Sequence, residues 1–397
     1  MGRECRDGVR SVAVRSWGME LGRSLGAALG ALMVIVDAWS VVGTVVVPRR
    51  VRSTLTRVLA RGVDVVFHLV ASRLQSYEGR DRLLAAQAPV QLMLQLLVWL
   101  GMFLLGYGLL LWPFIGHHFF GYALEESGAA LTTLGYVVPR RAGEIAITIL
   151  AAISGLATVA LQIGYLPALY GAFNRRETLV TMLDARAGVP SWGPELLART
   201  HYGLGTGTSA LGELPRWFEQ WEQWSADVAE SHATYLPLVD FRSPRALSSW
   251  VTAQIAVLDA AALYLALVPD AAGAISARLC LRSGFTCLTT IARAKGYDVP
   301  LEADPDRGIS LTFEEFVDAI ERLRAVDFPI GRDPEQAWPE FVGWRVNYEA
   351  AAYALAFGID GPPALWSGPR PHSSVLIPPQ RPATRRASLP SAGPAEQ

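Results

Sequence analysis

The stretch FGYALEESGAALTTLGY, from Phe120 to Tyr136, lies between two long apolar runs, and this order decides the fold that we expect. The runs, Pro89 to Phe114 and Ile145 to Phe173, each exceed the roughly 20 residues that an α-helix needs to cross a bilayer. A soluble core seldom supplies two such runs so close together. Both runs are therefore predicted to span a membrane.

The stretch between the runs is too short to be a span of its own. Glu125, Glu126, Arg140 and Arg141 bracket its apolar core. Non-helical backbone is tolerated at membrane depth only where it is buried in protein or lines a water-filled cavity. The stretch therefore predicts a short helix followed by an irregular, re-entrant loop.

The loop carries the letters TTLGY. The order of span, short helix, TTLGY loop and span resembles the pore module of the potassium-channel superfamily, whose signature loop is usually written TTVGYGD. The resemblance covers residues 89–176 closely and the remainder loosely. In that family, backbone carbonyls and a threonine hydroxyl replace the water shell of a cation, and four loops surround one axis. The resemblance thus implies a homotetramer with a filter formed by Thr132, Thr133, Leu134, Gly135 and Tyr136.

The match to the signature ends after Tyr136. Val137, Val138 and Pro139 stand where the family has a second glycine and an aspartate. A β-branched residue at positive φ costs about 1–2 kcal/mol, so either the outer mouth differs in shape or selectivity is relaxed. We expect passive flow of monovalent cations, K⁺ foremost. The alternative is a non-conducting, pore-fold membrane sensor or scaffold that signals through its soluble domain.

Five further residues within the range 89–176 are expected to support the pore or its gating. Glu125 and Glu126 fall in the first half of the predicted pore helix, where carboxylates suit the positive end of the helix dipole, so we expect them to cap or buttress it. Gly155 and Gly164 permit bending, and Pro167 removes a helical hydrogen bond, which makes all three gating candidates. Glycines in membrane helices are also commonly sites of close packing.

A further apolar run predicts a span at residues 25–47, after an N-terminal segment of residues 1–24. This span contains Asp37, and an acid inside a membrane is a functional candidate by default. Asp37 is expected to face a neighbouring helix or water. The alternative is a buried hydrogen bond to Trp39, Ser40 or a helix of the pore module.

Residues 48–88 form a basic linker with an amphipathic helix. Eight arginines and only three acids lie between Pro48 and Gln87, which predicts a cytoplasmic location by the positive-inside rule. Counting spans from there leaves the N-terminus outside and the C-terminal part in the cytoplasm. The chain is thus expected to be a multi-pass protein of the cell membrane.

Residues 177–360 predict a helical cytoplasmic domain. Trp217, Trp221 and Trp224 share one helical face that suits a core. The run from Val251 to Val268 is only marginally long enough to span and has Asp259 near its centre, so a buried helix is expected. Thr312 to Glu315 predicts a capping box. Nine prolines in residues 361–397 predict a disordered tail.

Composition excludes several classes of function. With 51% hydrophobic and 18% charged residues, the chain is too apolar for an ordinary soluble protein, so an all-α membrane protein with a soluble domain is expected. A net charge of −1 gives no sign of nucleic-acid binding. The sequence shows no nucleophile and base pair, metal-ligand cluster or nucleotide loop. We therefore expect a protein that is not an enzyme and needs no cofactor or bound metal.

Overall fold

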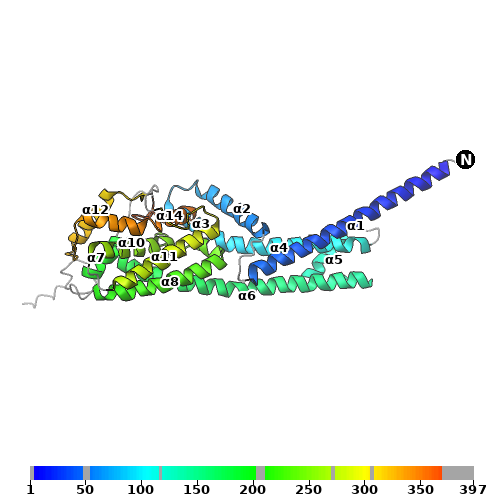
Figure 1. Ribbon diagram of the computed structural model, residues 1–397. Helices are drawn as coiled ribbons and strands as arrows, with labels where there is room; N and C mark the ends of the chain where they lie inside the picture. The colour runs from blue at the N-terminus through cyan, green and yellow to red at the C-terminus, as the bar shows by residue number, and fades with distance from the viewer. Residues whose placement is uncertain are drawn as a thin grey trace, which may run out of the picture. The chain divides into compact units, whose positions relative to one another are not determined.

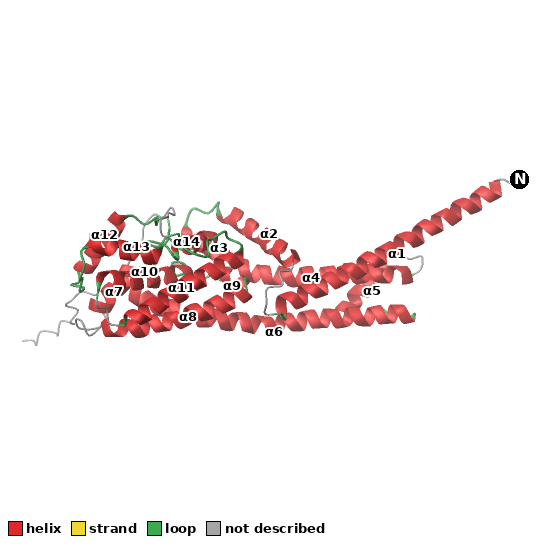
Figure 2. Cartoon of the chain, viewed as in Figure 1, coloured by secondary structure: helices red, strands yellow, loops and turns green. Residues whose placement is uncertain are grey.

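The computed structural model describes residues 4–47, 54–115, 119–202, 211–269, 273–304 and 308–368, with side chains in the first helix described from Glu20 onward. Within these ranges all regular structure is helical (Figure 2). The predicted tail of residues 361–397 lies mostly outside them. The chain divides into two compact units at three points. One lies just before α3 (Tyr77–Leu84), one inside α3, and one inside α6 (Ala142–Ala187).

Four helical segments among the described residues are long and apolar enough to cross a membrane. They are Glu20–Val45, Tyr77–Phe114, Ala142–Ala187 and Trp250–Leu267. The last differs from the others, because 94% of its most apolar window is buried inside the protein, against 17–39% for the other three. The expectation that this fourth run is a core helix is therefore confirmed.

The first unit contains α1 (Glu4–Val45), α2 (Thr54–Ala71), α4 (Gln87–Leu111), the short 3₁₀ helix η1 (Trp112–Phe114), α5 (Phe120–Leu131) and the first part of α6. Helix α1 packs along α4 (Figure 1). A Cβ atom at Gly30 would lie 2.5 Å from the carbonyl oxygen of Gly106, so the two backbones touch at this crossing. Further along the same interface, the indole N–H of Trp99 donates to Ser40 Oγ at 3.1 Å.

Helix α2 falls within the predicted basic linker of residues 48–88 and is amphipathic, as expected. It buries Val63 and Ala71. An apolar face that includes Val58, Val65 and Leu69 stays exposed in the single chain. Such a face suits the boundary between headgroups and acyl chains.

The second unit is a helical domain that includes residues 76–81, the second part of α6 and the C-terminal helices. Helix α10 forms the centre of its core, and α8 packs along α11. Trp217, Trp221 and Trp224 are all buried, as their spacing predicts. The C-terminal helices are α7 (Gly193–Tyr202), α8 (Leu214–Thr234), α9 (Pro237–Asp240), α10 (Trp250–Leu267), α11 (Ala274–Lys295), α12 (Phe313–Arg324), α13 (Pro334–Arg345) and α14 (Glu349–Gly358).

The predicted capping box is confirmed, and the structure also shows the partners of Asp259. Thr312 and Glu315 form a capping box at the start of α12, in which each side chain accepts a hydrogen bond from the other residue's backbone N–H. Asp259, the acid inside the apolar helix α10, accepts hydrogen bonds from Arg345 at 2.5 Å and from the hydroxyl of Tyr348 at 2.6 Å. A buried carboxylate is tolerated there because a buried guanidinium neutralises it.

Candidate pore-loop site

Helix α5 carries the TTLGY loop at its C-terminal end, and it contacts both α4 and α6. The hydroxyl of Ser127 donates to the carbonyl of Leu104 on α4 at 2.9 Å. On the same side, a Cβ atom at Gly108 would lie 3.0 Å from Leu124, so small residues let the two helices approach closely. Ala123, Ala129 and Leu131 are buried, and α5 is therefore fixed along most of its length.

The two glutamates of α5 have different surroundings. Glu126 is 3% exposed, and its Oε1 accepts a hydrogen bond from the hydroxyl of Thr148 on α6 at 3.1 Å. Glu125 is exposed. Neither residue caps the helix, because α5 begins at Phe120 and has no acidic residue in its first turn. The capping alternative is thus wrong, whereas Glu126 does buttress α5 against α6.

The backbone of the loop turns sharply after α5. The N–H of Leu134 donates to the carbonyl of Ala129 at 2.9 Å, and the N–H of Thr133 donates to that of Ala130 at 3.0 Å. This is the hydrogen-bond pattern of a Schellman motif, which needs a left-handed residue at the position of Thr133. Its φ is 56°. Glycine is usual there, and a β-branched residue is strained by about 1–2 kcal/mol.

Gly135 also has a positive φ, of 67°. Glycine reaches such an angle without strain because it has no Cβ atom. A Cβ atom at Gly135 would meet no atom within 4 Å. The requirement for glycine is therefore one of backbone conformation and not of space.

The donors and acceptors of the loop are used unequally. The N–H groups of residues 132–135 all donate to carbonyls of the last turn of α5. No hydrogen bond from another described residue reaches the carbonyl oxygens of residues 132–136. In the single chain Leu134 is 69% and Tyr136 is 59% exposed. The loop thus offers a run of unused acceptors on an accessible surface.

The far end of the loop is clamped at the start of α6. The carboxylate of Glu144 accepts hydrogen bonds from the N–H groups of Arg140 at 2.9 Å and Arg141 at 3.1 Å. The guanidinium of Arg141 donates to the carbonyl of Phe114 at 2.9 Å. These contacts tie the beginning of α6 to the end of the α4 segment.

The three gating candidates lie on α6, which continues as one helix through Pro167. Gly155 touches α5, since a Cβ atom there would lie 2.3 Å from the carbonyl oxygen of Leu131. Gly164 has open space around it. Gly155 is therefore a close-packing glycine, whereas packing within the single chain gives no reason for glycine at position 164.

Asp37 lies on α1 and is completely buried in the first unit. Neither of its carboxylate oxygens has a hydrogen-bond partner among the described residues. The expected alternative of a buried hydrogen bond is therefore wrong. Ser40 instead accepts a hydrogen bond from Trp99, and Trp39 is 66% exposed.

Metal-binding side chains do not gather in the described part of the chain, where no group of three or more His, Cys, Asp or Glu residues could hold an ion. Comparisons with protein-family models, curated proteins and solved structures find no match to this chain. In the first unit the candidate ion ligands are the backbone oxygens of residues 132–136 and the hydroxyls of Thr132 and Thr133.

Polar residues on the flanking helices complete the site, and the sequence analysis missed them. Thr148 holds Glu126, and the hydroxyls of Tyr107 and Ser154 lie 2.7 Å apart between α4 and α6. Thr148, Ser154 and Thr158 recur along α6 at intervals of four to six residues within an apolar helix. These hydroxyl side chains could have predicted which face of α6 packs against the rest of the first unit.

Proposed function

We propose that this protein is the subunit of a homotetrameric cation channel of the pore-loop type, with K⁺ as its principal ion. Cations pass through the TTLGY loops of four chains, where carbonyl oxygens of residues 132–136 replace water around the ion. The protein lies in the cell membrane as a multi-pass chain, and the second unit lies in the cytoplasm.

The observation that carries this proposal is the unequal use of the loop's backbone groups. The N–H groups of the loop are taken by the C-terminal carbonyls of α5, while the carbonyl oxygens accept nothing from the described residues. Unused acceptors need water or an ion as a partner, because an unsatisfied carbonyl in a dry environment costs free energy. Leu134, Tyr136 and Val138 are exposed in one chain, which fits a loop that is covered only by its copies.

Reconstitution into liposomes tests conduction. We expect vesicles that contain the purified wild-type protein to show K⁺ flux well above that of empty vesicles. Gly135→Ala should reduce this flux at least about tenfold, since a left-handed non-glycine residue costs about 1–2 kcal/mol in each subunit. Gly101→Ala is the matched control, because both glycines have open space around a new Cβ but only Gly135 has a positive φ. Wild-type flux no greater than that of empty vesicles would overturn the proposal.

A non-conducting sensor or scaffold is the second candidate. The observation in its favour is the Schellman motif of Thr133, since this motif also ends ordinary helices that have no ion to bind. Val137 in place of the family's second glycine points the same way. In a scaffold, Gly135→Ala would leave vesicle flux at the level of empty vesicles, as in the wild type, and would alter only stability.

A further inference from the structure

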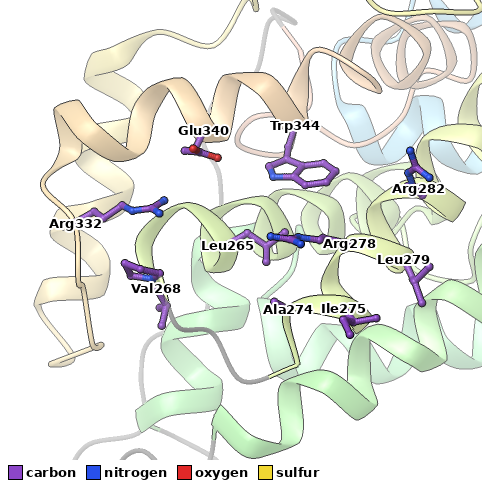
Figure 3. Close-up of a pocket in the computed structure, with 11 residues that line it drawn as sticks. Leu265, Val268, Ala274, Ile275, Arg278, Leu279, Arg282, Arg332, Glu340 and Trp344 are labelled. Atoms are coloured by element: carbon purple, nitrogen blue, oxygen red, sulfur yellow. The ribbon is translucent and has the colours of Figure 1, made fainter.

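The second unit contains a pocket of about 590 Å³ that conduction through the pore loop does not use. It lies between the end of α10, the first half of α11 and α13 (Figure 3). Small-molecule sites commonly have volumes of about 300–1,000 Å³. The side chains that decide its chemistry are Arg278, Arg282, Arg332, Glu340 and Trp344.

The pocket has an excess of positive charge. Arg278 and Arg282 are four residues apart on α11, so both guanidinium groups lie on one side of that helix. Among the described residues, no ion pair within 4.0 Å involves Arg278, Arg282 or Arg332. Glu340 is the one acid among the lining residues, which leaves the pocket with a net charge of +2.

Arg332 is held in place before any ligand arrives. Its Nη1 donates to the carbonyl of Ala266 at 3.2 Å, and the N–H of Gly331 donates to that of Leu267 at 2.8 Å. A Cβ atom at Gly331 would lie 2.9 Å from Pro269, so glycine permits this close approach to the end of α10. An arginine has five N–H donors, and Arg332 therefore keeps most of them for a ligand.

Trp344 supplies a flat apolar surface beside these charges. Its half-buried ring packs against the core of the unit on one side and lines the pocket on the other. Figure 3 draws Arg332 and Arg282 toward opposite ends of the pocket, with Arg278 and Trp344 between them. A ring that stacks on an indole can thus sit next to an anion that arginines bind.

We propose that this pocket binds a nucleotide, with its phosphate held by Arg278 and Arg282 and its base stacked on Trp344. A phosphate monoester carries about −1.5 to −2 charges at pH 7, which matches the excess charge of the pocket. Arginine binds phosphate oxygens in a bidentate manner, which adds geometric selectivity. Glu340 accepts a hydrogen bond from a sugar hydroxyl or from an amino group of the base.

Equilibrium dialysis of the purified full-length protein with radiolabelled AMP tests the proposal. We expect saturable binding that weakens as salt is added. The double variant Arg278→Gln and Arg282→Gln should weaken AMP binding at least about 30-fold, as expected for lost hydrogen bonds to a charged group. Arg216→Gln is the matched control, because Arg216 is an exposed arginine on α8 that does not line this pocket.

The role of the base is tested separately from that of the phosphate. Trp344→Leu should weaken AMP binding about tenfold but leave competition by inorganic phosphate unchanged, and Trp344→Phe should restore most of the affinity. Each variant must keep the wild-type thermal midpoint. Equal competition by AMP and inorganic phosphate would overturn the stacking role. Binding to vesicles that contain phosphatidic acid, with no affinity for AMP, would identify a lipid headgroup site and overturn the nucleotide proposal.

Discussion

A Cβ atom on Gly155 would lie 2.3 Å from the carbonyl oxygen of Leu131, the last residue of α5. The backbone of α6 therefore touches α5 at the point where the TTLGY loop leaves it. No side chain can stand between the two without moving one of them, because real Cβ contacts are much longer than this distance. Gly155 thus sets the position of the loop relative to α6.

Gly155→Ala should move the end of α5 away from α6 and impair the loop. We expect a loss of stability of about 1–3 kcal/mol from overpacking and a large fall in K⁺ flux. Thermal unfolding of the detergent-solubilised protein and liposome flux measure the two effects. Gly101→Ala serves as the control, since its Cβ meets no atom within 4 Å and alanine favours a helix by up to about 1 kcal/mol. Equal behaviour of the two variants would contradict the packing role.

The two adjacent glutamates of α5 should respond differently to substitution. Glu126→Ala removes a buried side chain and its hydrogen bond from Thr148 on α6, so we expect a loss of about 1–3 kcal/mol. Glu126→Gln keeps an acceptor and should be milder. Glu125→Ala should change stability by less than about 0.5 kcal/mol, because the side chain is exposed. Thermal unfolding distinguishes these outcomes, and a larger effect at position 125 would refute the assignment.

Substitution of Thr133 should affect stability and ion selectivity in different ways. Thr133→Gly removes a strained β-branched residue from a left-handed position, so stability should stay constant or rise by up to about 1 kcal/mol. The same change removes a hydroxyl from the proposed filter, and the ratio of K⁺ to Na⁺ flux should fall. Thr133→Ser keeps the hydroxyl and should retain most of the ratio. If both variants keep the wild-type ratio, the hydroxyl has no part in selectivity.

The sequence predicted the helices better than the contacts between them. Apolar run length was enough to predict the long apolar helices and the buried helix at Val251 to Val268, and the spacing of Thr312 and Glu315 predicted the capping box, because these depend on local patterns. The partner of Asp259, in contrast, lies 86 residues away at Arg345, and no local pattern could reveal it. Long-range pairing of this kind is set by how the helices pack.

The candidate site, likewise, was predicted only in part from the sequence. The TTLGY motif was enough to predict where the loop lies. The positive φ of Gly135 explains why a glycine stands at that position. The positive φ of Thr133 was not foreseen, because threonine is among the residues least suited to that conformation. The helix dipole argument for Glu125 and Glu126 failed because both residues lie in the middle of α5, beyond the first turn to which the dipole effect is largely confined.

Burial of His232 in the core of the second unit should make the stability of the protein depend on pH. His232 is buried beside Arg176, whose guanidinium lies 2.9 Å from its Nε2. A guanidinium can only donate, so Nε2 accepts and the ring is neutral, with its proton on Nδ1 facing the hydroxyl of Ser231 at 3.0 Å. Burial, and next the positive charge of Arg176, hold the pKa of His232 well below its ordinary value of 6.5.

This lowered pKa has a definite sign in stability. Below about pH 6.5 the unfolded chain binds a proton at His232 that the folded protein does not, so the free energy of unfolding falls as pH falls, by up to about 1.4 kcal/mol per pH unit. Above about pH 6.5 this contribution is constant. His232→Gln keeps an acceptor for Arg176 but cannot titrate, and it should flatten the decline of the thermal midpoint between about pH 6.5 and 5. Parallel curves for the wild type and His232→Gln would show that His232 contributes nothing to the pH dependence.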